Sequence, residues 1–164
     1  MRSFSNLWYW IGLAVLWSTV SHWVMGVPHD MLIRARREGS GQAMDDLHDL
    51  VRVNSNRISY IATVSGSWLF LIGSAGLTFL ALTAFVYDVE ISQAVFFLMA
   101  PMMILWFMTA RMANVIRKNG HRDQELVKRL IRHRMATQML GVVSIFVTAM
   151  FGMYKNLNVG PWLF

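Results

Sequence analysis

The sequence has no cysteine, only three prolines and few acidic side chains. The lack of thiolates excludes a disulfide framework and any zinc or iron–sulfur site built on cysteine. Charged residues make up 15% of the 164 residues and hydrophobic residues 55%, whereas about 25% of a typical soluble domain is charged. This composition excludes a disordered tail and is typical of an integral membrane protein.

Four long apolar stretches run through the chain, over residues 7–25, 62–86, 91–112 and 135–154. Each approaches or exceeds the roughly 20 residues of helix that cross about 30 Å of hydrocarbon. Their only Asp, Glu, Lys or Arg is Arg111, which lies close enough to an end for its side chain to reach the headgroups. The sequence therefore predicts an all-α integral membrane protein, a single domain over residues 1–164 with four transmembrane helices.

Basic residues are distributed unequally between the two sides that four spans define. Residues 26–61 and 111–134 hold thirteen of the 15 Lys and Arg, whereas the opposite side holds only Arg2 and Lys155. Because the more basic side stays in the cytoplasm, we expect both termini in the periplasm of a bacterial inner membrane. The net charge of +6 then reflects orientation rather than a nucleic-acid partner. Cleavage of the first stretch as a signal peptide is disfavoured by its bulky residues near any cleavage site.

The segments between the spans, residues 26–61 and 113–134, are predicted to be cytoplasmic helical extensions. A first helix over residues 29–38 ends at the Gly-Ser-Gly sequence of residues 39–41, which breaks helices. A second helix follows and runs toward the second span, with residues 54–56 as its weakest point because Asn and Ser prefer caps and turns. The third and fourth spans likewise continue beyond the membrane as one long hairpin.

Three acidic residues of the first extension, Asp45, Asp46 and Asp49, are expected to face basic residues of the second. Those basic residues are Arg122, Lys128, Arg129 and Arg132. Exposed ion pairs of this kind contribute under about 1 kcal/mol each and would hold neighbouring helices together. Basic residues left over would lie near anionic lipid headgroups or a partner.

The same acidic run is a candidate catalytic site. On a helix, Asp45 and Asp49 share a face at i, i+4 and could hold Mg²⁺ bound to a diphosphate. The run Asp45-Asp46-Leu47-His48-Asp49 resembles the acidic motifs of membrane prenyltransferases. With Ala35-Arg36 and Gly41 before it, the run also resembles part of the signature of CDP-alcohol phosphatidyltransferases, although no Asp-Gly pair precedes Ala35. This resemblance implies a magnesium-dependent membrane lipid transferase as one alternative function.

Two further sets of side chains suggest a cofactor or a metal. His22 and His133 lie near the cytoplasmic ends of the first and fourth spans, where two imidazoles on facing helices could bind haem b. Methionines of the third and fourth spans could bind Cu(I), although Met is also the usual filler of apolar packing. They are Met99, Met102, Met103, Met150 and Met153. A small haem-binding redox protein and a copper carrier or channel are therefore further alternatives.

Small residues on the second span indicate helix packing rather than chemistry. Gly66 and Gly73 would let another helix approach closely. The four apolar stretches contain no carboxylate, and the sequence has no complete Ser-His-Asp set and no phosphate-binding loop. We therefore interpret the chain as a non-catalytic accessory subunit of a larger respiratory, photosynthetic or transport complex. Its partners would be larger integral membrane subunits and anionic lipid headgroups.

Overall fold

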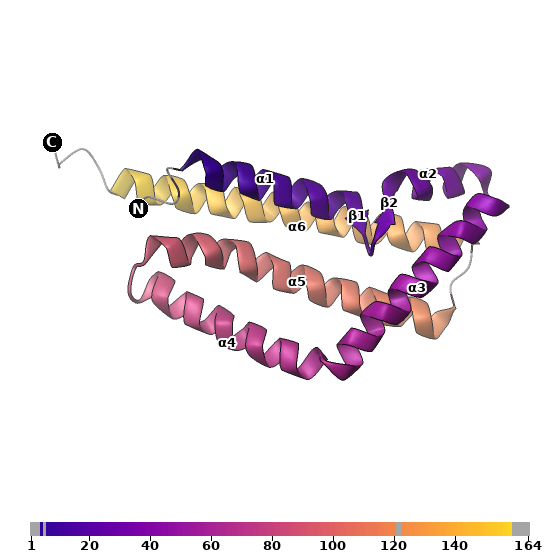
Figure 1. Cartoon of the computed structure of the whole chain (residues 1–164). Helices are drawn as coiled ribbons and strands as arrows, with labels where there is room; N and C mark the ends of the chain where they lie inside the picture. The colour runs from indigo at the N-terminus through magenta and orange to yellow at the C-terminus, as the bar shows by residue number, and fades with distance from the viewer. Residues whose placement is uncertain (1–3, 5, 121–122, 159–164) are drawn as a thin grey trace.

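The computed structural model describes residues 4, 6–120 and 123–158, and this part of the chain is almost entirely helical (Figure 1). Within these residues the chain forms six helices and one two-stranded hairpin. In chain order they are α1 (Leu7–His22), β1 (Trp23–Val24), β2 (Val27–Pro28), α2 (His29–Glu38), α3 (Gln42–Val64), α4 (Gly66–Phe85), α5 (Glu90–Asn119) and α6 (Asp123–Asn158). The all-α prediction is confirmed.

Three helices are long and apolar enough to cross a membrane, namely α4, α5 and residues Asp123–Leu157 of α6. They contain most of the second predicted span and all of the third and fourth. By contrast, α1 has 16 residues, which at about 1.5 Å per residue gives about 24 Å, less than the hydrocarbon thickness of about 30 Å. By length and composition, the described residues thus supply three spanning helices rather than the four predicted.

The first predicted span ends earlier than expected. α1 stops at His22 rather than continuing to Met25, because the next two residues pair as an antiparallel hairpin with Val27 and Pro28. Met25 and Gly26 make the turn with φ angles of 53° and 73°, a left-handed conformation that glycine adopts without strain. Beyond the hairpin α2 continues away from α1, in contact with α3 and α6 (Figure 1).

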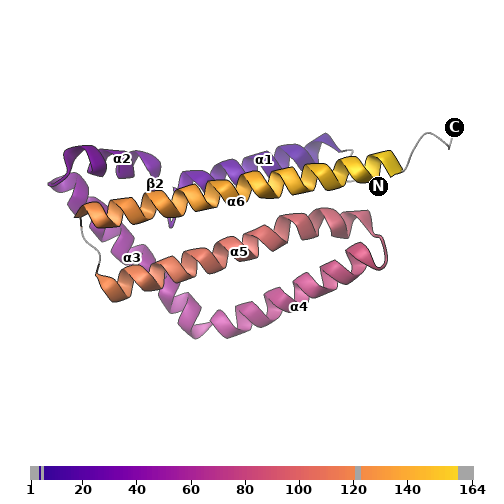
Figure 2. The same ribbon diagram turned by 180° about the vertical axis from the view of Figure 1, so that it is seen from behind.

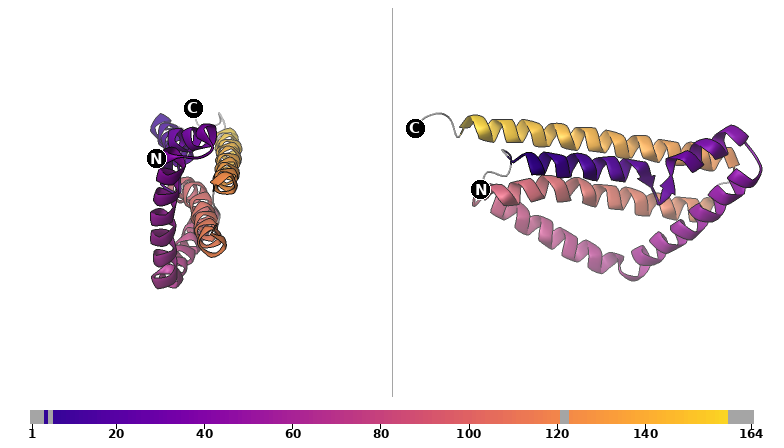
Figure 3. Two further views of the ribbon diagram at one scale, coloured as in Figure 1. Left: turned by 90° about the vertical axis from the view of Figure 1, so that its right-hand side faces the viewer. Right: turned by 45° about the horizontal axis from the view of Figure 1, so that its top comes forward.

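The boundary between α3 and α4 also differs from the prediction. The helix runs unbroken through residues 54–56, where the hydroxyl of Ser55 is buried and donates to the carbonyl of Val51 in the preceding turn. It breaks at Ser65 instead, and α4 begins at Gly66, within the predicted span of residues 62–86. Adjacent Ser and Gly are a common cause of helix kinks. As a result α3 and α4 form an open V rather than one straight helix (Figure 3).

The long helices lie side by side in a bundle. α1 packs along α6, and α5 lies between α6 and α4, with which it forms an antiparallel hairpin (Figures 1 and 2). The start of α1, the α4–α5 turn and the end of α6 lie together, and we call this the turn end. We call the opposite end the basic end. It contains the β hairpin, α2, the start of α3, the end of α5 and the start of α6. This arrangement places the two basic segments of the sequence at the same end.

The apolar core lies at the basic end. It consists of Met25, Val27, Leu32, Ala35, Met44, Leu47, Val51, Ala113, Ile116, Leu126, Val127 and Leu130. These side chains come from the hairpin, α2, α3, the end of α5 and the start of α6, and most lie outside the apolar stretches. By contrast, only 6% of the most apolar segment of α4 and 11% of that of α5 is buried within the chain. The spanning helices therefore direct most of their apolar side chains outward.

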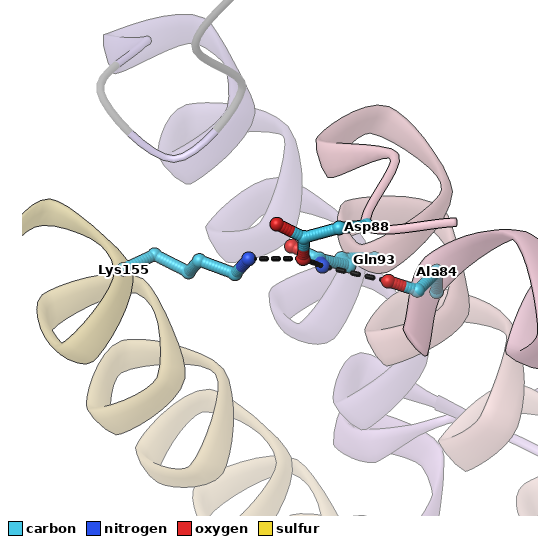
Figure 4. A network of polar contacts seen from close by, with 4 residues as sticks. All are labelled: Ala84, Asp88, Gln93 and Lys155. Carbon is cyan, nitrogen blue, oxygen red and sulfur yellow. Dashed lines mark hydrogen bonds and ion pairs between the residues drawn. The ribbon is translucent and has the colours of Figure 1, made fainter. Parts of the chain in front are cut away.

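Polar contacts join the helices at the turn end. Nζ of Lys155 on α6 donates to the carboxylate of Asp88, which follows α4 (Figure 4). Nε2 of Gln93 on α5 lies 2.7 Å from that carboxylate and 2.7 Å from the carbonyl oxygen of Ala84, to both of which it donates. The three helices thus converge on one carboxylate. The hydrogen bonds from Lys155 and Gln93, with Lys155 the stronger cause, hold the pKa of Asp88 below its usual range.

Replacing Leu47 with Ala should destabilise the chain by about 2–5 kcal/mol, because Leu47 is fully buried in the core at the basic end. Val53→Ala is the control, since Val53 lies on the same helix with 57% of its surface exposed and should change stability by no more than about 0.5 kcal/mol. Denaturant unfolding of both variants in detergent, followed by circular dichroism, measures the difference. Equal losses would contradict a core at this end.

Asp88→Asn should flatten the loss of stability at acid pH. A lowered pKa in the folded state contributes stability above the unfolded pKa, and this contribution is lost as pH falls through the folded pKa. The substituted amide has no charge to lose, while its oxygen can still accept from Gln93. Thermal unfolding midpoints measured as the pH falls below about 4 should therefore decline more steeply in the wild type. Parallel declines in the two proteins would show that Asp88 has no such role.

Candidate functional site

The candidate site surrounds residues 131–138 of α6, where this helix enters its apolar stretch. Residues four apart lie on one face of a helix, so His133 and Thr137 share one side and Arg134 and Gln138 another. The two sides line different hollows in the protein surface. The helical period thus places the adjacent residues His133 and Arg134 in different hollows.

The first hollow, of about 410 Å³, lies between the end of α1, α3, α5 and α6. Its polar side chains include Arg57, Thr109 and His133, and its apolar ones come from α1, α3, α5 and the turn of the β hairpin. His133 is only 8% exposed, and its Nε2 lies 3.3 Å from the hydroxyl of Thr109. Because Thr137 donates to the carbonyl of His133 at 3.0 Å, both residues have partners within the protein.

Two further hollows open on the other side of α6. One, of about 330 Å³, lies between α2 and α6 and is lined by His29, Arg36, Arg134 and Gln138 together with apolar side chains. The other, of about 460 Å³, is lined by His22, three hydroxyl residues of α1 and again Arg134. Arg134 therefore lies where the two hollows adjoin, beside the end of α1 and the start of α2.

The charges around this junction are mainly positive. Burial lowers the pKa of His29, and the positive charge of Arg134 and the neighbouring His22 lower it further, against the opposing effect of Asp30. Nδ1 of His29 is buried and has no hydrogen-bond partner among the described residues. An uncompensated positive potential of this kind favours an anion.

The structure does not bring the predicted haem pair into one hollow. His133 lines the hollow between α3 and α5, whereas His22 is exposed and lines the hollow beside Arg134. His22 instead lies close enough to His29 and Arg134 to share their electrostatic environment. Haem b binding through His22 and His133 stays a prediction.

Asp45, His48 and Asp49 line a hollow of about 680 Å³ between α3 and the facing ends of α5 and α6. The predicted shared face of the two aspartates is therefore present. Nε2 of His48 accepts the backbone N–H of Asp123 at 2.9 Å. Among the described residues, no group of three or more His, Asp or Glu side chains is placed to hold a metal. The magnesium-dependent transferase stays a prediction.

Among the described residues, the acidic run forms none of the ion pairs expected with Lys128, Arg129 and Arg132 of α6. Asp49 pairs with Arg52 of its own helix at 2.9 Å, and Asp46 lies 3.6 Å from Arg34 of α2. On α6, Arg129 lies 3.8 Å from Glu125, one helical turn earlier. Lys128 and Arg132 are exposed, and Arg122 lies outside the described residues. Asp49 and Arg129 thus pair one turn away on their own helices, where no interhelical alignment is needed, whereas the partner of Asp46 lies on α2.

The two glycines predicted to contact a partner differ in their surroundings. A Cβ added to Gly73 would lie 3.6 Å from Cε of Met103 on α5, so Gly73 packs within the chain. A Cβ added to Gly66 or Gly76 would meet no atom within 4 Å. Met103 therefore faces α4, and Met99, Met150 and Met153 are among the exposed side chains, so the copper hypothesis gains no support.

Sequence reasoning missed a close contact between α1 and α6. A Cβ on Gly141 of α6 would lie 2.7 Å from the ring of Trp17 on α1, and one on Gly152 would lie 3.2 Å from Phe4. Trp17 is 4% exposed, so the glycine provides the space that lets a large ring pack against the α6 backbone. The sequence signal for this contact is the presence of Gly141 and Gly152 within the fourth predicted span.

Gly141→Ala should destabilise the packing of α1 on α6 by about 1–3 kcal/mol, because the new methyl group overlaps the Trp17 ring. Gly76→Ala, in open space on α4, should be neutral or stabilise the chain by up to about 1 kcal/mol. Thermal unfolding in detergent measures the midpoint, and tryptophan fluorescence reports the displacement of Trp17. Equal effects of the two substitutions would refute this contact.

Comparison with known proteins assigns no residue a role. No protein-family model, no curated protein and no solved structure matches the chain. Function must therefore be inferred from the geometry of the described residues.

Proposed function

We propose that the chain is a non-catalytic accessory subunit of a larger multi-subunit membrane complex, attached to its partner through the exposed surface of α4. It would cross a bacterial inner membrane four times, with the basic end in the cytoplasm. The exposed apolar surface of α4 is the observation that carries this proposal, because a helix with 6% of its apolar segment buried leaves most of that segment open to a partner.

Four spans require that α1 also crosses the bilayer. α1 carries no charged residue before His22 and packs along α6, so the two helices share the same depth. Its length of about 24 Å is short, but a shorter helix is accommodated by local thinning of the bilayer and by flanking residues that reach the interface. Packing of Trp17 against Gly141 couples α1 to a helix that is long enough to span.

The charges that the fold collects at one end support the proposed orientation. Thirteen of the 15 Lys and Arg belong to residues 26–61 and 111–134, which make up much of the basic end. At the turn end, Lys155 is paired with Asp88. Because the basic side of a membrane protein remains in the cytoplasm, this asymmetry favours periplasmic termini.

The surface of α4 differs from that of α6 in a way that suits a helical partner. The glycines of α6 are covered within the chain, Gly141 by Trp17 and Gly152 by Phe4. On α4, Gly66 and Gly76 are uncovered, with space for an approaching helix. Small residues at an interface allow close backbone contact, which is the main source of association between helices in lipid. Large side chains beside them, such as Ile72 at 67% exposure, would add contact area.

Polar residues that could suggest catalysis have structural partners. Asp46 and Asp49 lie near arginines, His48 accepts a backbone N–H, and His133 lies beside Thr109. Such pairs stabilise the arrangement of the helices at the basic end, which agrees with a non-catalytic role.

Photo-cross-linking in native membranes tests the subunit proposal. A benzoylphenylalanine at Ile72 on α4 should give a discrete protein adduct, whereas one at Phe146 on α6 should react mainly with lipid. The two positions are matched, with exposures of 67% and 64%. Adding Gly76→Leu should reduce the adduct at position 72, because the larger side chain blocks close approach to a site that is open in the isolated chain. Absence of any protein adduct at position 72, or equal adducts at both positions, would overturn the proposal.

A further inference from the structure

The hollow between α2 and α6 combines positive charge with an apolar lining. Arg36 and Arg134 provide positive charge from two different helices, and Gln138 adds a hydrogen-bond donor. Apolar side chains of Leu32, Ile33, Ile131 and Met135 line the same hollow. We call this hollow the arginine pocket.

In the described part of the chain, Arg36 and Arg134 have no acidic partner. None of the ion pairs among the described residues includes Arg36 or Arg134. By contrast Arg34, on the same helix as Arg36, lies 3.9 Å from Glu38 and 3.6 Å from Asp46. Two uncompensated guanidinium groups lining one hollow repel each other, and a shared anion relieves this repulsion with charge-assisted hydrogen bonds.

The position of the pocket along α6 places it at the membrane surface. Arg134 is the last charged residue before the apolar stretch of residues 135–154, and Met135 is the first residue of that stretch. Met135 is 61% exposed, so the apolar side of the pocket is continuous with the surface that would face acyl chains. Polar and apolar walls therefore meet at the depth of the lipid phosphates.

We propose that the arginine pocket binds the headgroup of an anionic phospholipid from the leaflet at the basic end. Arg36 and Arg134 contact the phosphate oxygens, Gln138 donates to the headgroup, and an acyl chain lies along Ile33 and Met135. Arginine suits this role because its planar group donates two parallel hydrogen bonds to phosphate. The inference depends on the membrane placement in the proposed function but not on a partner subunit.

The adjoining hollow enlarges the region of positive potential. His22 lines it together with Arg134, and both raise the positive potential at His29. Hydroxyl groups of Ser18, Thr19 and Ser21 line the same hollow and can donate to further headgroup oxygens. A glycerol-bearing headgroup thus finds donors on both sides of Arg134, whereas a bulky choline cation would meet positive charge.

Lipid binding to the purified chain tests this inference. Native mass spectrometry and detergent titration would measure the affinity for dioleoyl phosphatidylglycerol, with dioleoyl phosphatidylcholine as the zwitterionic comparison. The double variant R36Q/R134Q should weaken binding of the anionic lipid roughly 10- to 30-fold, the effect of removing two phosphate contacts at a membrane surface. The matched control R37Q/R132Q also removes two positive charges, but from exposed positions beside the pocket. It should weaken binding by about threefold or less.

Several outcomes would overturn the inference. Equal losses in the two double variants would mean that diffuse surface charge attracts the lipid, and equal affinity for both lipids would remove the anion requirement. Stabilisation of the chain by millimolar inorganic phosphate to the same extent as by the lipid would point to a free phosphate site. If R36Q/R134Q does not fold by circular dichroism, the single variant R36Q, on the exposed side of α2, replaces it in the same comparison. Because the isolated chain is used, failure here leaves the cross-linking test of the partner surface unaffected.

Discussion

Burial of apolar side chains at the basic end is the constraint on which the arrangement of the helices depends. Inside a bilayer, apolar side chains gain nothing by leaving lipid for one another, so the spans have no hydrophobic reason to associate. Outside it, water supplies that reason. Leu47 of α3, Leu126 and Leu130 of α6, and Ile116 of α5 share one core with the hairpin and α2. This core sets the spacing and direction with which α5 and α6 enter their apolar stretches.

Farther from the core, contacts depend on fit and hydrogen bonds. Trp17 packs into the space that Gly141 leaves, and at the turn end Lys155 and Gln93 share the carboxylate of Asp88. α4 takes part in few such contacts beyond its hairpin with α5. A helix attached on one side and open on the others is available to lipid or to another protein, which is why the proposed function places the partner there.

The functional residues cluster where the two kinds of environment meet. At residues 133 and 134 of α6, adjacent side chains point into different hollows, one enclosed by α3 and α5 and the other bounded by α1 and α2. His133 has a hydrogen-bond partner in Thr109, whereas Arg134 beside it lacks an acidic partner among the described residues. In the proposed membrane placement, this arginine would connect the charge asymmetry of the chain to a specific contact with a lipid headgroup.

Residue type along the chain determined the helical class, the helix over residues 29–38, the spanning lengths of α5 and α6 and the concentration of basic residues on two segments. These properties depend on composition and local backbone preference, which the sequence displays directly. Tertiary structure decided that α1 ends at His22 in a hairpin, that the break before α4 falls at Ser65, and that His22 and His133 line different hollows. It also decided which glycines are covered. The surroundings of the histidines and glycines depend on segments distant in sequence, whose relative rotation about the helix axes no local pattern specifies.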